Sequence, residues 1–152
     1  MYQQVVNHLK GLFEDFVIDT GGRDTKSQRS AIIVSDVYIL PFRPRSFDVW
    51  TLYDSINLVE ESKIINPKLR VVAVLNQADF KSSSENEDSR KLFVEDPLIK
   101  KSLVLLDAPL SIRKAFATSA AAGLSVVEQK PRDPKAIEEM QRFFDFVTNL
   151  HF

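Results

Sequence analysis

Two short apolar runs constrain the fold of this chain more than any other feature, because each ends abruptly in residues that break or cap secondary structure. The first run is Phe-Val-Ile at 16–18, followed by Asp19 and a glycine pair. The second is Val-Tyr-Ile-Leu at 37–40, followed by Pro41. Continuous apolar runs are typical of strands buried on both faces of a parallel sheet. We therefore expect strand, helix and strand, with Asp19 and Pro41 at the carboxyl edge of the sheet, where such folds bind ligands.

Apolar periodicity and turn residues predict that strands and helices keep alternating along the chain. Further strands are expected at 69–75 (ending at Asn76), 103–106 and, as an edge strand, 124–128. Helices are expected at 2–13, 24–34, 46–65, near 92–96, 111–118 and from 133 onward, with 81–89 either a loop or the polar start of a helix. Asp24 and Ser46 are expected to cap helices. The fold class that follows is α/β, a three-layer doubly wound and mostly parallel sheet in one domain over residues 1–152.

Composition limits the classes of function. Twenty basic and twenty-one acidic side chains give a net charge of −1, so binding to nucleic acid or a membrane would need a local patch. The chain has no cysteine, which excludes disulfides and thiol chemistry and fits a reducing cytosol. No apolar run approaches the roughly 20 residues that span a bilayer, and no signal peptide is visible, so we expect a cytoplasmic protein. His8 and His151 lie at opposite ends of the sequence, which argues against a histidine-based metal or nucleophile site.

Asp19 is the first candidate for chemistry. A carboxylate at the end of a buried strand, followed by a hydroxyl and two glycines, suits a Walker-B-type magnesium site, because Mg²⁺ takes one or two carboxylates and glycine lets phosphates approach the backbone. The alternative is an ordinary turn residue or helix cap.

Four segments together resemble the central and C-terminal part of the ParA/MinD-like partition ATPases, which are deviant Walker P-loop NTPases. They are residues 15–24 (Asp-Phe-Val-Ile-Asp-Thr-Gly-Gly-Arg-Asp), 35–52, 71–79 (Val-Val-Ala-Val-Leu-Asn-Gln-Ala-Asp) and 112–126. The likeness covers nearly the whole chain in the family's order and spacing. It implies ATP and Mg²⁺ as cofactors, with Asp19 bonded to a water of Mg²⁺ and Asn76 facing the adenine. The resemblance places four further residues at the phosphates or in the nucleotide cleft: Thr20, Gly21, Gly22 and Pro41.

The sequence departs from the family at the phosphate loop. No Gly-x-x-x-x-Gly-Lys-Ser/Thr can be written in it, although this loop supplies the N–H cradle and the lysine that hold phosphates. Three hypotheses follow. The chain is a shortened ParA-like partition protein without autonomous ATP hydrolysis, an ATPase completed by a loop from another chain or from upstream residues, or an α/β interaction module without a nucleotide role.

The family's phosphate-loop strand lies between the Walker-B strand and the strand after it, so its absence would leave backbone groups unpaired. Either 15–19 pairs directly with 36–40, or a second copy fills the gap, or a separate polypeptide does. A homodimer is our hypothesis, with a full-length ParA-like relative as the other candidate partner. The resemblance also implies a ParB-like adaptor and nonspecific DNA binding. The cluster nominated for DNA is Lys100, Lys101, Arg113 and Lys114, against the alternative of an ordinary solvated face.

Overall fold

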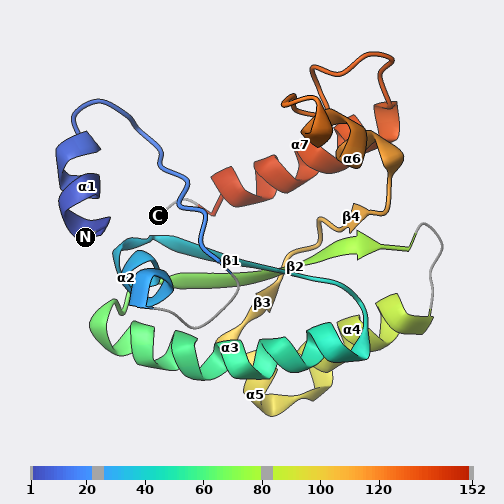
Figure 1. Cartoon of the computed structure of the whole chain (residues 1–152). Helices are drawn as coiled ribbons and strands as arrows, with labels where there is room; N and C mark the ends of the chain where they lie inside the picture. The colour runs from blue at the N-terminus through green and yellow to red at the C-terminus, as the bar shows by residue number, and fades with distance from the viewer. Residues whose placement is uncertain (1, 22–25, 80–83, 151–152) are drawn as a thin grey trace.

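The computed structural model describes residues 2–21, 26–79 and 84–150, and Figure 1 shows helices packed on a small sheet. In chain order the elements are α1 (Tyr2–Leu9), α2 (Lys26–Val34), β1 (Val37–Phe42), α3 (Ser46–Ile65), β2 (Arg70–Ala78), α4 (Ser84–Glu95), α5 (Pro97–Ser102), β3 (Val104–Leu105), β4 (Leu110–Ser111), α6 (Lys114–Ala121) and α7 (Pro134–Thr148). The predicted α/β class with a parallel sheet is confirmed. The arrangement is compatible with a three-layer P-loop-like fold that lacks the N-terminal strand.

β2 is the central strand of the sheet. It pairs in parallel with β1 from Val37↔Arg70 to Phe42↔Leu75, and on its other side with β3 and β4. The strands on both sides of β2 hydrogen-bond to its backbone N–H and C=O groups. The central residues of β2 can therefore carry apolar side chains on both faces of the sheet. All five residues at 71–75 are buried, as the continuous apolar run predicts.

The main core lies between the sheet and α3. Leu52, Ile56 and Val59 of α3 are almost fully buried, which confirms the inward face predicted from their helical spacing. They join a cluster that includes Ile32 of α2 and Ile99 of α5. Figure 1 shows α3 and α5 on one side of the sheet and α1, α6 and α7 on the other.

The predicted strand at 15–19 is wrong. Residues 15–20, all of them described, form no strand, and the Val17 side chain is 97% exposed. Burial alternates along the segment, with Phe16 and Ile18 half-buried. Direct pairing of this segment with β1 is wrong as well, because β2 is the partner of β1 among the described residues. An apolar run becomes a buried strand only where a neighbour satisfies its backbone N–H and C=O groups, and no described strand pairs with this run.

Several element boundaries also differ from the predictions. Asn76 lies inside β2 rather than at its end, opposite Leu110 of β4. The edge strand expected at 124–128 is a turn, closed by a hydrogen bond from the Glu128 N–H to the Ser125 carbonyl. Ser46 is the first helical residue of α3 and Arg45 is its N-cap, one position before the predicted cap. Sequence reasoning missed α5, which Asp96 caps through the N–H groups of two residues in its first turn.

Other chain signals act as predicted. α3 stops at Asn66, before Pro67. Gly123 has φ +68°, the left-handed conformation that glycine adopts easily after a helix. Asp133 caps α7 with Pro134 at the first helical position. The cap predicted at Asp24 lies outside the described residues.

Candidate functional site

Asp19, Thr20 and Gly21 lie on the irregular segment between α1 and α2. Asp19 and Gly21 are exposed and Thr20 is half-buried. Gly21 stands in open space, where an added Cβ would meet no heavy atom within 4 Å. Gly22, the fourth member of this predicted group, lies outside the described residues. The segment therefore presents a carboxylate and a hydroxyl at the surface, without the strand that was expected to fix them.

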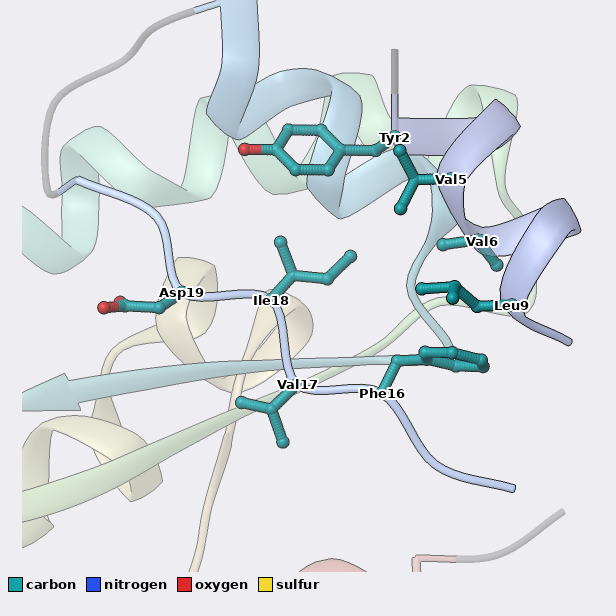
Figure 2. A pocket seen from close by; sticks show the side chains of 8 residues that line it. All are labelled: Tyr2, Val5, Val6, Leu9, Phe16, Val17, Ile18 and Asp19. Carbon is teal, nitrogen blue, oxygen red and sulfur yellow. The ribbon is translucent and has the colours of Figure 1, made fainter. Parts of the chain in front are cut away.

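Asp19 stands at the end of a hollow of about 290 Å³ between α1 and this segment. Figure 2 shows apolar side chains of α1 facing Phe16 and Ile18, while the Asp19 carboxylate points away from α1. The lining is Tyr2, Val5, Val6, Leu9, Phe16, Val17, Ile18 and Asp19. The lining is mostly apolar, with the Asp19 carboxylate and the Tyr2 hydroxyl as its polar side-chain groups, and among the described residues it contains no cationic side chain that would neutralise a phosphate.

Pro41 and Asn76 lie on neighbouring strands, towards the carboxyl ends of β1 and β2. Pro41 is exposed, and Asn76 is half-buried and opposite Leu110 of β4. The next residue, Gln77, has φ +54°, and the β2–β4 register shifts between Asn76 and Ala78. Backbone strain of this kind in a residue other than glycine often accompanies functional sites. Nothing in the sequence singled out Gln77, because glutamine has no special preference for the left-handed region.

A polar cluster that sequence reasoning missed holds the carboxyl end of β4. One Glu139 carboxylate oxygen of α7 accepts hydrogen bonds from the Arg113 guanidinium at 2.6 and 3.0 Å and from the Ser111 hydroxyl at 2.9 Å. The other accepts the Ser111 N–H at 2.9 Å. The Arg113 and Glu139 side chains are only 13% and 19% exposed.

The two charges of this cluster stabilise each other. Burial raises the pKa of Glu139, but the hydrogen bonds from Arg113 and Ser111 outweigh it, so this pKa is lowered. The pKa of Arg113 is raised, chiefly by the hydrogen bond to Glu139. Arg113, nominated from sequence as a DNA contact, is therefore engaged in an internal ion pair.

The structure does not gather the four nominated basic residues on one element. Lys100 and Lys101 lie in the last turn of α5, while Arg113 and Lys114 are at the start of α6. Figure 1 shows these two helices on opposite sides of the sheet. Lys100, Lys101 and Lys114 are exposed, and Lys101 lies 3.8 Å from a carboxylate oxygen of Glu60.

The described residues fit part of a magnesium–nucleotide site. Asp19 offers one accessible carboxylate, the ligand type that Mg²⁺ prefers. Within the described ranges no group of three or more His, Asp or Glu side chains could hold a metal ion. No Gly-x-x-x-x-Gly-Lys-Ser/Thr motif can be written in the sequence. The site as described therefore lacks the groups that would bind phosphates. In the same part of the chain, none of the helices has the length and apolar character needed to cross a membrane.

Comparison with known proteins finds a distant relationship. No family model matches the chain. It is similar to the maintenance of carboxysome distribution protein A of Halothiobacillus neapolitanus (strain ATCC 23641 / c2), with 22% identity over 116 residues. The match covers 76% of this chain and 51% of that protein, so the chain spans about half the length of its curated relative. The similarity agrees with the ParA/MinD-like resemblance carried by the sequence motifs.

Proposed function

We propose that this chain is a ParA-like positioning protein of the cytoplasm that does not hydrolyse ATP by itself. The observation that carries the proposal is the similarity to a protein named for maintaining carboxysome distribution, across 76% of the chain. The parallel α/β sheet is consistent with it. The absence of autonomous hydrolysis in the proposal is supported by the sequence, in which no Gly-x-x-x-x-Gly-Lys-Ser/Thr motif can be written.

In this proposal the nucleotide site forms only when a phosphate loop is supplied by another polypeptide, such as a full-length ParA-like relative. Asp19 would then hold a water of Mg²⁺, and Asn76 would face the base. The other residues assigned to that assembled site are Thr20, Gly21, Gly22 and Pro41. Bound Mg²⁺–ATP would be the energy source for positioning. This chain would contribute the Asp19 carboxylate to the site. A ParB-like adaptor would link the assembly to its cargo.

Titration of ATP and Mg²⁺ into the purified chain tests the proposal, with Asp19→Ala as the matched variant. The chain alone should bind nucleotide weakly or not at all and show no turnover. Addition of a full-length ParA-like relative should give binding or turnover that the Asp19→Ala variant reduces. Because Asp19 is exposed, this variant should fold like the wild type.

Two outcomes would contradict the proposal. Turnover by the chain alone, unchanged by Asp19→Ala, would mean that the nucleotide site lies elsewhere. No effect of nucleotide or of a ParA-like partner would favour the α/β interaction module without a nucleotide role.

Nonspecific DNA binding is part of the proposal. It is assigned to Lys100 and Lys101, which share the last turn of α5, because Arg113 is paired with Glu139 and Lys114 is on α6, across the sheet. Removing Lys100 and Lys101 should weaken retention on duplex DNA and reduce the dependence of that retention on salt.

A further inference from the structure

The carboxyl end of β2 depends on β4 for its strand pairing. The pairing of β1 with β2 ends at Phe42↔Leu75, and β3 pairs with an earlier part of β2. Beyond Leu75, β4 is the strand that pairs with β2 among the described residues. Asn76 and Gln77 therefore have a strand of two residues as their neighbour. Asn76 is the residue that the proposed function assigns to the base.

Gln77 makes this end of β2 difficult to hold. Its φ of +54° lies in the left-handed region, and the β2–β4 register shifts between Asn76 and Ala78. A residue with a side chain is less stable in this conformation, which persists only where neighbouring contacts determine it. The Ile112 N–H donates to the Ala78 carbonyl at 2.9 Å, directly after the irregular position. The position of β4 therefore determines whether Gln77 keeps its conformation.

Glu139 of α7 fixes β4 from the other side. Its two carboxylate oxygens accept the Ser111 N–H and the Ser111 hydroxyl, each at 2.9 Å, and Arg113 donates to the same carboxylate. Ser111 is paired with Ala78 of β2. Glu139 and Arg113 are largely buried, where hydrogen bonds between charged groups are strong. Hydrogen bonds and strand pairs thus join Glu139 to Gln77, and Figure 1 shows β4 between α7 and the carboxyl end of β2.

We propose that Glu139 is a positioning residue for Asn76. Glu139 holds β4 in register, β4 keeps Gln77 in the left-handed conformation, and this conformation sets the direction of Asn76 at the carboxyl end of β2. A change in α7 would therefore alter base binding through β4. The role of Asn76 at a base rests on the proposed function, whereas the link from Glu139 to Asn76 is tested without nucleotide.

Amide hydrogen exchange of the chain without nucleotide tests this link, with Glu139→Ala and Arg142→Ala as a matched pair. Both variants remove an ion-pairing side chain from α7, but Asp107, the partner of Arg142, lies outside β4. In Glu139→Ala the Ile112 amide should exchange roughly tenfold faster or more relative to the Leu106 amide, which bonds to the middle of β2. A general loss of stability speeds both amides, so their ratio isolates the release of β4. Arg142→Ala should leave the ratio unchanged.

Gln77→Gly separates positioning from a purely structural role. Glycine adopts a φ near +54° without a steric penalty, so the irregular position in β2 should survive without Glu139. Glu139→Ala should shift the NMR signals of the Asn76 backbone and side-chain amides, and should shift them much less when Gln77→Gly is also present. A purely structural loss at Glu139 would not be repaired by a glycine in β2.

Three results would overturn the proposal. One is a folded Glu139→Ala whose Asn76 signals match those of the wild type. Another is an exchange ratio between Ile112 and Leu106 that Glu139→Ala leaves unchanged. The third is an equal shift of the Asn76 signals with and without Gln77→Gly, because Gln77 would then not be the link.

Ser111→Ala takes the place of Glu139→Ala if that variant does not fold. It removes the hydroxyl bond to Glu139 and keeps the backbone bond, so the same exchange ratio should rise by a smaller factor. An unchanged ratio in Ser111→Ala would refute the link. None of these measurements needs nucleotide, so a failure of the nucleotide site would not alter them.

Discussion

Two apolar runs that look alike in the sequence differ in the folded chain. The run at 71–75 lies in β2 and is buried throughout, with Val74 only 2% exposed. The run at 16–18 lies in an irregular segment, where Val17 is 97% exposed. β2 has strands on both sides, and the other run has none among the described residues. Hydrophobicity makes a run tolerant of burial, but hydrogen-bonding neighbours decide whether it becomes a strand.

The same substitution in each run is the strongest test of this comparison. Val74→Ala should lower the free energy of unfolding by roughly 2–3 kcal/mol, because it removes buried methyl groups and leaves a cavity in β2. Val17→Ala should change it by no more than about 0.5 kcal/mol, because that side chain is in water. Denaturant unfolding of both variants and the wild type measures the difference. Equal losses would mean that the segment at 16–18 is packed in solution.

A second short segment shows what holds a peripheral element in place. β4 has only two residues, yet it pairs with β2 and is tied to α7 by the Arg113–Glu139–Ser111 cluster. Arg113→Ala should destabilise the fold by roughly 1–2 kcal/mol, since it leaves a largely buried carboxylate without its cation.

Arg142→Ala is the matched control for this prediction. Arg142 also pairs with a carboxylate, Asp107, at 2.7 Å, but both side chains are more than half exposed. Its loss should cost less than about 0.5 kcal/mol. Thermal or denaturant unfolding measures both variants. A larger loss of stability in Arg142→Ala than in Arg113→Ala would contradict the role given to the buried pair.

The pH dependence of stability gives the smallest expected effect. Since the pKa of Glu139 is lowered in the folded state, its ionised form stabilises the fold above its unfolded value of about 4.3, and this contribution is lost as pH falls through the folded value. Glu139→Gln has no such titration. Wild-type stability should therefore fall more steeply than that of Glu139→Gln as pH drops below the usual glutamate range.

The quantity to measure is the difference in unfolding free energy between the wild type and Glu139→Gln at each pH. The lowered pKa values of Asp96 and Glu128 destabilise both proteins in acid, so their effect cancels in this difference. Parallel acid-unfolding curves would show that Glu139 does not contribute.

The sequence predicted the elements whose signals are local. Proline and glycine ended helices at Asn66 and Gly123, Asp133 and Pro134 began α7, and helical spacing identified the buried face of α3. The candidate site was less accessible to this reasoning. Asp19 was expected at the end of a buried strand, but no strand precedes it among the described residues. Glu139 was invisible in sequence, because its partners lie 26 and 28 residues away.

Local chemistry in the sequence was enough to set the α/β class, both ends of α3, the start of α7 and the apolar runs that could enter a sheet. Which run did enter was decided by the tertiary structure, through the strands available to pair with it. The same holds for Arg113, whose basic side chain suggests a surface contact until α7 brings Glu139 against it. Pairing and burial depend on residues far apart in the chain, and no single stretch of sequence contains that information.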